Sequence, residues 1–228
     1  MSEVAEVDPL RPDRAEAAIA AAARAVGDGR LVVMPTETVY GIGCRPDDDD
    51  ATARLFAAKG RSQGLNLAVL AASADEALAM TLTGSAPHAA SLAAALWPGP
   101  LTMVLPRSAR TRAWPLGEDG DTIGVRVPDQ PLARALFGRT GPLAVSSANR
   151  SGEPPARTRG QLLAAFGDAV AVYLVTLEPL VGADPSTVVD LTDPPRIRLV
   201  RPGPLTRERM AGVLGASVPE PEWVDFPP

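Results

Sequence analysis

Short apolar runs alternate along the chain with longer stretches in which apolar residues recur every three to four positions. The longer stretches predict helices, and the short runs predict strands. Expected helices span 13–26, a segment that ends near Lys59, 74–82, 86–96, 130–137, 158–166 and 206–214. Expected strands span 30–34, 67–71, 101–105, 122–127, 143–146, 169–175, 187–191 and 197–200. Several strands follow one another without a helix between them, so the pattern favours a mixed-sheet α/β fold over a strictly parallel one.

Aspartate, glycine and proline mark where several of these elements begin or end. The acidic run 47–50 supplies N-cap candidates for the second helix, and Gly60 is placed at the position that ends this helix. Residues 108–120 are expected to form a loop that exposes Trp114. The proline-rich residues 219–228 are expected to form an arm or a disordered tail.

The size and composition are those of a globular protein. The chain has 228 residues, of which 46% are hydrophobic and 21% are charged, and one large domain is the simplest prediction. No charged, apolar and small-residue signal segment opens the chain, and no apolar run is long enough to cross a membrane. We therefore expect a cytoplasmic protein with no membrane partner.

The charge balance is acidic. A net charge of −5 and an isoelectric point of about 5.0 argue against a protein whose main role is to wrap nucleic acid. Two local basic runs depart from this balance, namely Arg107, Arg110 and Arg112, and Arg150, Arg157 and Arg159. Either run could contact a phosphate backbone, although a solvated surface is the more common role of such runs.

Cysteine and histidine each occur once. The single Cys44 excludes an intramolecular disulfide and a cysteine metal cluster, and the single His88 excludes a multi-histidine metal site. His88 follows Pro87 and precedes alanines, so we expect it at the surface start of a helix rather than as a general base.

Lysine also occurs once, since 21 of the 22 basic residues are arginine and the remaining one is Lys59. An ammonium is a compact, strongly hydrated point charge, whereas a guanidinium is a planar fork, and the two are not interchangeable. Lys59 is therefore a candidate for a position where only the point charge fits. The alternative is that it interacts with the last carbonyl groups of its helix.

The sequence lacks the common phosphate-binding and nucleophile motifs. It contains neither G-x-x-x-x-G-K-[ST] nor a complete G-x-G-x-x-G, and no G-x-S-x-G elbow. Polar clusters instead lie at the ends of apolar runs: Thr36 to Tyr40, Lys59 and Arg61, Thr122 and Arg126, Ser146 to Asn149, Ser186 and Thr187, and Arg201. The even offset of Thr122 and Arg126 puts both on one face of their strand. These hydroxyl and cationic groups suit an anionic, multi-phosphate substrate that is bound and aligned without covalent catalysis.

Seven short motifs, in order, resemble the YrdC/Sua5 family. They are P-T-E-T-V-Y-G-I-G at 35–43, K-G-R at 59–61, W-P-G-P-L-T at 97–102, T-I-G-V-R-V-P at 122–128, S-A-N-R-S-G at 147–152, S-T-V-V-D at 186–190 and R-P-G at 201–203. The resemblance implies a YrdC-like domain over 1–206, with its core at 13–206, followed by a C-terminal helix and tail at 207–228. It also implies an α/β fold with a twisted mixed sheet, largely antiparallel with parallel pairs, flanking helices and a concave cationic cavity.

Members of this family make L-threonylcarbamoyladenylate and pyrophosphate from L-threonine, bicarbonate and ATP. Their product feeds the t6A modification of tRNA at position 37. The resemblance therefore implies a nucleotidyltransferase of this kind, with Mg2+ accompanying ATP. Candidate partners are tRNA and a downstream threonylcarbamoyl transferase.

Carried over position by position, the resemblance implies two sets of binding residues. Those for threonine are Thr38, Arg126, Val145 and Ser186, with Arg126 on the substrate carboxylate. Those for ATP are Lys59, Arg61, Asn66, Thr122, Ser147, Asn149 and Arg201. Lys59 and Arg61 would act in catalysis, and Lys59 and Asn149 would face the phosphates. No protein residue is expected to bind a metal.

The chain departs from the family pattern after the K-G-R motif. The family usually continues through a proline to Asn-Pro-Leu and a strand that ends in histidine, whereas here Asn66 is displaced by one position and Leu70 ends the strand. Pro155 stands where the family often has a serine that helps to hold ATP. The alternative hypothesis is a family relative that binds a nucleotide or RNA without this synthesis, for which the basic residues in 150–159 would matter more than Arg126.

Overall fold

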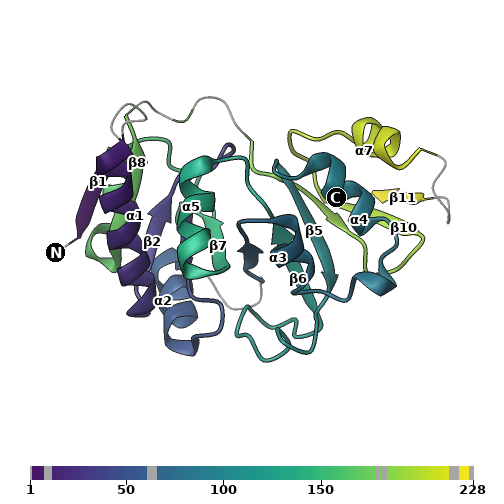
Figure 1. Ribbon diagram of the computed structural model, residues 1–228, viewed down its shortest axis with the longest axis horizontal. Coiled ribbons are helices and arrows are strands. Elements are labelled where there is room, and N and C mark those ends of the chain that lie inside the picture. The colour runs from purple at the N-terminus through teal and green to yellow at the C-terminus, as the bar shows by residue number, and fades with distance from the viewer. Residues whose placement is uncertain are drawn as a thin grey trace.

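Eleven strands lie side by side in one sheet in the computed structural model (Figure 1). The structure describes residues 2–7, 12–60, 66–177, 180, 184–215 and 221–225. The strands are β1 (Glu3–Val7), β2 (Leu31–Met34), β3 (Gly41–Cys44), β4 (Ala68–Leu70), β5 (Leu101–Pro106), β6 (Thr122–Arg126), β7 (Leu143–Ser147), β8 (Val170–Thr176), β9 (Thr187–Asp190), β10 (Arg196–Arg201) and β11 (Glu222–Asp225). Their order across the sheet is β1-β8-β2-β3-β7-β4-β6-β5-β9-β10-β11, so the first and last strands of the chain form the two edges.

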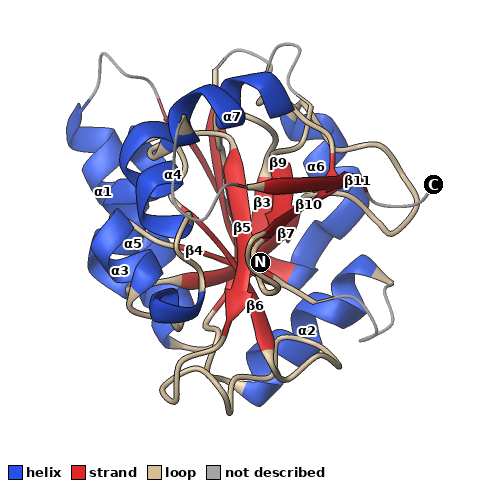
Figure 2. Ribbon diagram, turned by 90° about the vertical axis from the view of Figure 1, so that its right-hand side faces the viewer, coloured by secondary structure: helices blue, strands red, loops and turns tan. Residues whose placement is uncertain are grey.

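Helices cover both faces of this sheet. In the described part of the chain they are α1 (Pro12–Gly27), α2 (Asp49–Lys59), α3 (Ala74–Leu78), α4 (Ala89–Leu96), α5 (Pro131–Thr140), α6 (Arg159–Phe166) and α7 (Arg207–Leu214). Figure 2 shows α1, α3, α4 and α5 on one side of the sheet and α2 and α6 on the other. The predicted α/β architecture with flanking helices is therefore confirmed.

Parallel and antiparallel pairings are equally frequent in the sheet. The pairs β1–β8, β8–β2, β4–β6, β5–β9 and β10–β11 are parallel, and the pairs β2–β3, β3–β7, β7–β4, β6–β5 and β9–β10 are antiparallel. The mixed sheet matches the prediction, with a larger parallel share than expected. The strands fan out in Figure 2, as the accumulated right-handed twist of many strands requires.

Strand β2 shows how the chain builds a core on each face. Val32 and Met34 pack in one hydrophobic cluster with α1 and α5, whereas Leu31 and Val33 belong to a second cluster that includes Leu55 of α2. Alternate side chains of a strand point to opposite faces. A strand buried on both faces therefore reads as a continuous apolar run, which is the pattern that predicted this strand.

The ends of α2 agree with the sequence prediction. The side chain of Asp48 accepts a hydrogen bond of 2.9 Å from the backbone N–H of Ala51 at the start of the helix. Gly60 ends the helix with φ 59°, a left-handed conformation that favours glycine. Lys59 therefore lies in the last turn of α2, and its side chain points into the protein.

Three strands were not predicted, namely β1, β3 and β11. β3 contains Gly41 and Gly43, which weaken any strand pattern in the sequence. A Cβ atom on Gly41 would lie 2.7 Å from Cγ1 of Val145 on the neighbouring strand β7. The glycines are therefore required by the close approach of β7, which a single sequence does not reveal. The helix predicted over 74–82 is also shorter, since α3 ends at Leu78.

The described C-terminal residues pack onto the fold, and residues 222–225, within the segment expected to form an arm, form strand β11. Met210 and Leu214 of α7 are buried in the core. β11 pairs in parallel with β10 and extends the sheet. The ring of Trp223 packs against the core and lies 5.5 Å from the Arg207 guanidinium, close enough for a cation–π contact.

Three residues expected at the surface are wholly or partly buried. His88 stands at the start of α4 as predicted, but it is only 4% exposed, and burial lowers the pKa of its imidazole. Arg107 is 1% exposed, and Trp114 is half-buried against the core. Sequence shows the charge or polarity of a residue but not what packs over it.

Across the described residues, no helix is both long and apolar enough to cross a membrane.

Candidate active site

A cavity of about 270 Å³ lies over the centre of the sheet. Its wall takes residues from seven strands that are neighbours in the sheet, in the order β3, β7, β4, β6, β5, β9 and β10. Several strands contribute alternate residues, such as Thr122, Gly124 and Arg126 on β6 and Ala68 and Leu70 on β4. Because residues two apart share a face, the cavity lies on a single face of the sheet. The small residues Ala68 and Gly124 leave the space open where larger side chains would fill it.

At one end of the cavity Arg126 is held by three protein groups. It is 5% exposed, its Nε donates to the carbonyl oxygen of Gly99 at 3.1 Å, and its Nη2 donates to Oγ1 of Thr38 at 3.0 Å. The same Nη2 lies 2.8 Å from Oε1 of Glu37. Burial lowers the pKa of Arg126, while the Glu37 carboxylate opposes this shift. Its Nη1 has no hydrogen-bond acceptor among the described residues, so this edge of the guanidinium remains for a ligand carboxylate.

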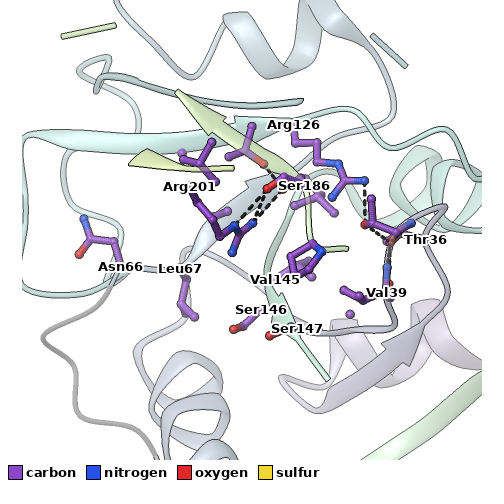
Figure 3. Close-up of a pocket in the computed structure, with 18 of the residues that line it drawn as sticks. Thr36, Val39, Asn66, Leu67, Arg126, Val145, Ser146, Ser147, Ser186 and Arg201 are labelled. Atoms are coloured by element: carbon purple, nitrogen blue, oxygen red, sulfur yellow. Dashed lines mark hydrogen bonds between the residues drawn. The ribbon is translucent and has the colours of Figure 1, made fainter. Parts of the chain in front are cut away.

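Arg201 and Ser186 meet beside Arg126 (Figure 3). Arg201 donates to the carbonyl oxygen of Ser186 from Nε at 3.1 Å and from Nη2 at 2.9 Å, and to the Ser186 hydroxyl at 3.0 Å. That hydroxyl also lies 2.8 Å from Oγ1 of Thr102. Burial, and then the positive charge of Arg126, lower the pKa of Arg201. The positive charges of Arg126 and Arg201 repel each other, so an anion in the cavity would stabilise both.

Gly203 explains why the R-P-G motif ends in glycine. A Cβ atom at this position would lie 2.5 Å from both the carbonyl oxygen of Pro185 and the backbone nitrogen of Thr187. Backbone atoms cannot move aside as a flexible side chain can, so no other residue fits here without displacing the chain. The glycine therefore allows the end of β10 to approach the start of β9, which brings Arg201 to Ser186.

Ser147 lines the cavity, and Lys59 and Asn149 lie behind it. Lys59 is 2% exposed, and its Nζ donates to the carbonyl oxygens of Ser147 at 2.5 Å and Asn149 at 2.8 Å. The Asn149 amide donates to the carbonyl oxygens of Arg150 at 2.8 Å and Glu153 at 2.7 Å. The ammonium therefore joins the K-x-R segment to the S-x-N segment. Whether only a point charge fits at this position stays a prediction.

Asn66 and Thr122 form the other end of the cavity, where Figure 3 shows Asn66 on the far side from Arg126. Both are tied to Asp119. The Asn66 side chain donates to the backbone oxygen of Asp119 at 3.1 Å and accepts from its N–H at 3.2 Å. The Thr122 hydroxyl donates to Oδ2 of Asp119 at 2.5 Å. Since this hydroxyl proton is committed to Asp119, Thr122 can only accept a hydrogen bond from a ligand.

The structure brings most of the predicted site residues to one cavity. Those that line it are Thr38, Asn66, Thr122, Arg126, Val145, Ser147, Ser186 and Arg201. Lys59 and Asn149 were implied to face the phosphates, but here their side chains bond to backbone carbonyl groups behind the wall, so a direct phosphate contact stays a prediction. Arg61 lies outside the described residues.

Three polar residues of the site, Thr36, Glu37 and Thr102, were given no binding role from the sequence. The Thr36 hydroxyl accepts from the backbone nitrogens of Thr38 and Val39 at 3.2 and 3.1 Å, which fixes the turn that carries Thr38. Thr102 supports Ser186, and Glu37 pairs with Arg126. Thr102 and Glu37 both lie inside family-like motifs, but only the fold shows which residue each one contacts.

The donor set does not form a metal cage. Within the described part of the chain, no group of three or more His, Cys, Asp or Glu residues is placed to hold a metal ion. Mg2+ prefers oxygen ligands and commonly binds with few protein contacts plus substrate phosphates. The residues present therefore fit a metal that enters with a nucleotide, as part of the substrate.

The open mixed sheet, with helices on both faces and a cavity lined by two arginines over its centre, defines the class as an α/β fold with a candidate active site. The family model Sua5/YciO/YrdC, described as telomere recombination, matches residues 24–203. The chain belongs to the Sua5/YciO/YrdC family.

Individual relatives agree with this assignment. A Mycobacterium tuberculosis protein is 42% identical over 210 residues, which is 91% of this chain and 94% of its own length. The threonylcarbamoyl-AMP synthase of Chromohalobacter salexigens is 44% identical over 178 residues, 76% of this chain and 92% of its own. The crystal structure of P. abyssi Sua5 complexed with L-threonine has a TM-score of 0.77 and 30% identity over 98% of this chain, which spans 62% of that Sua5 chain.

Proposed function

We propose that this protein is a threonylcarbamoyl-AMP synthase, a nucleotidyltransferase that makes L-threonylcarbamoyladenylate and pyrophosphate from L-threonine, bicarbonate and ATP. The observation that carries the proposal is the shared cavity, in which Arg126 and Arg201 lie beside the hydroxyl groups of Thr38, Ser186 and Ser147. Relatives that match most of the chain carry this name, and a structural relative binds L-threonine.

In this proposal the Arg126 end of the cavity binds the amino acid. The available Nη1 of Arg126 would take the threonine carboxylate, while Thr38, Glu37 and Gly99 hold the guanidinium in place. A hydrogen bond between this charged N–H group and a carboxylate is charge-assisted and therefore stronger than one between neutral groups. Ser186, which Arg201 and Thr102 orient, would contact the same substrate.

The chemistry would need alignment rather than a protein nucleophile. A proton from the threonine ammonium would convert bicarbonate to CO2 and water. The free amine would then add to CO2 and release its second proton to solvent, which gives a carbamate whose oxygen attacks the α-phosphorus of ATP as pyrophosphate leaves. Burial raises the pKa of the Cys44 thiol to about 12, so this cysteine is not a thiolate nucleophile. Arg201 and the Ser147 segment would stabilise the charge that develops on the phosphoryl oxygens. Mg2+ would neutralise phosphate charge when it arrives with ATP.

The product would serve the t6A modification of tRNA, with a downstream threonylcarbamoyl transferase as its consumer, in the cytoplasm where ATP and tRNA occur.

An RNA-binding role without synthesis has less support. Within the basic run at 150–159, Arg150 donates to the carbonyl oxygen of Ala165 at 3.2 Å, and no residue of this run lines the cavity.

The test is a substrate-omission assay. Pyrophosphate release should require L-threonine, bicarbonate and ATP together, and it should fall by about a hundredfold in Arg126→Ala. Arg112→Ala, which removes an exposed arginine, is the matched control and should behave like the wild type. Release that does not depend on threonine would contradict the proposal. Retention of tRNA by the protein alone, falling steeply with salt, would favour the RNA-binding alternative.

A further inference from the structure

We propose that Arg107 is a positioning residue for the end of the cavity formed by Asn66 and Thr122, and that it acts by fixing the segment 111–122. This inference rests on the proposed function, because it assigns that end to the nucleotide. Arg107 does not line the cavity, so its effect is indirect. The sequence suggested only a member of a basic surface run.

Arg107 is a fully buried guanidinium that organises a long loop. Its Nε donates to the carbonyl oxygen of Thr122 at 2.8 Å, and its Nη2 donates to that of Asp119 at 2.8 Å. Its Nη1 donates to the carbonyl oxygens of Trp114 at 2.8 Å and Thr111 at 3.3 Å. One side chain therefore binds four carbonyl groups along the segment 111–122.

The burial of this charge makes the loop conformation obligatory. Burial lowers the pKa of Arg107, while the carboxylates of Asp119 and Asp121 oppose the shift. No carboxylate within the described residues forms a salt bridge with it, so the carbonyl dipoles carry most of the compensation. A buried charge without such partners is strongly unfavourable. A shift of the loop that left Arg107 buried would therefore remove the acceptors of a desolvated cation.

The loop in turn holds the cavity wall. Asp119 bonds to both ends of the Asn66 side-chain amide and to the Thr122 hydroxyl. The carbonyl oxygen of Leu116 accepts from the backbone N–H of Leu67 at 2.7 Å. Asn66, Leu67 and Thr122 all line the cavity. A continuous chain of hydrogen bonds thus runs from Arg107 to three residues of the wall.

Gly117 is an independent sign that this contact is tight. It has φ +141°, and a Cβ atom there would lie 2.3 Å from Oδ1 and 2.9 Å from Cα of Asn66. The loop therefore touches the backbone of Asn66 at a distance that only glycine allows. A shift of the loop would be transmitted directly to Asn66 rather than absorbed by a gap.

The test compares the affinities of the two substrates. Arg107→Lys keeps a positive charge but has three N–H donors on a compact head that cannot span four carbonyl groups, and Arg107→Gln removes the charge while keeping an amide donor. Both variants, and Asp119→Ala, should raise the KM for ATP about tenfold and change the KM for threonine by less than about twofold. Arg112→Lys, an exposed residue of the same loop, is the control and should leave both constants unchanged.

Each outcome decides the inference. A merely structural role of Arg107 would lower the amount of active enzyme, with both KM values unchanged, or raise both KM values together, and either result overturns the proposal. If neither Arg107 variant folds, an unchanged KM for ATP in Asp119→Ala overturns it.

Equilibrium dialysis with labelled ATP separates this inference from the proposed function. If the wild type binds ATP but releases no pyrophosphate in response to threonine, the proposed synthesis fails. The Kd for ATP must still rise about tenfold in the variants for the positioning role to stand. If the wild type does not bind ATP, both proposals fall.

Discussion

The Nζ atom of Lys59 donates a hydrogen bond of 2.5 Å to the carbonyl oxygen of Ser147, which joins the last turn of α2 to the end of β7. Ser147 lines the cavity, so the ammonium supports the wall from behind. The ammonium of Lys59 is a compact group that donates to two carbonyl oxygens in a space almost closed to solvent.

The exchange Lys59→Arg should lower turnover by about tenfold or more and reduce the free energy of unfolding by about 1–3 kcal/mol, because a planar guanidinium is too large for the site. Pyrophosphate release and urea unfolding measure the two effects. Arg24→Lys makes the reverse exchange at an exposed position in the last turn of α1 and should change neither. Wild-type turnover in Lys59→Arg would show that the single lysine is at this position by chance.

Removing Glu37 from its ion pair with Arg126 should destabilise the protein. The two side chains are 22% and 6% exposed, and removing one partner of a buried pair leaves an uncompensated charge. Glu37→Gln should therefore lower the free energy of unfolding by about 3 kcal/mol. Glu16→Gln breaks the exposed pair with Arg139 and should cost less than about 1 kcal/mol. Equal losses in urea unfolding of the two variants would refute this reading.

Asp119 should give the protein a stability component that is lost in acid. Desolvation raises the pKa of its carboxyl, but hydrogen bonds from the Thr122 hydroxyl and from backbone N–H groups outweigh it, so the pKa lies below its usual value. A depressed pKa stabilises the fold above the unfolded pKa of about 3.9, and this contribution disappears as pH falls through the folded pKa.

The measurement is the difference in unfolding free energy between the wild type and Asp119→Asn as a function of pH. We expect a constant difference above about pH 5 and a smaller one as the pH falls below about 4. A difference that stays constant to pH 3 or grows in acid would mean that the Asp119 hydrogen bonds do not favour its ionised form.

Gly41→Ala should affect threonine more than ATP. The added Cβ would lie 2.7 Å from Cγ1 of Val145, which lines the cavity, so Val145 must move. We expect the KM for threonine to rise several-fold and the free energy of unfolding to fall by about 1–3 kcal/mol. Gly27→Ala is the control, since a Cβ atom there meets nothing within 4 Å. A larger effect on the KM for ATP would place Val145 in the nucleotide site instead.

Local signals were sufficient for much of the fold. Asp48 and Gly60 mark the ends of α2 because a cap depends on residues within one helical turn. Strands β2 and β8 are apolar on both faces, so their sequences predict strands without knowledge of their neighbours. The shared face of Thr122 and Arg126 likewise follows from the two-residue period of a strand.

Edge strands of the sheet and close contacts between backbones could not be predicted from local signals. β11 forms because β10 offers an unpaired edge, and β3 contains glycines because β7 lies against it. In both cases the determining atoms belong to residues far away in the chain. The sequence of β3 or β11 alone therefore gives little indication that the segment forms a strand.

By itself the sequence determined most of the helices and strands, the family and part of the cavity lining, because motifs and periodicity are local and keep their order along the chain. The tertiary structure decided which charges are buried and what each one contacts. Arg107 and Arg112 are alike in sequence, yet one binds four carbonyl groups inside the protein and the other is exposed. The difference arises because burial depends on the loop that folds back over Arg107, a long-range packing event that no local pattern encodes.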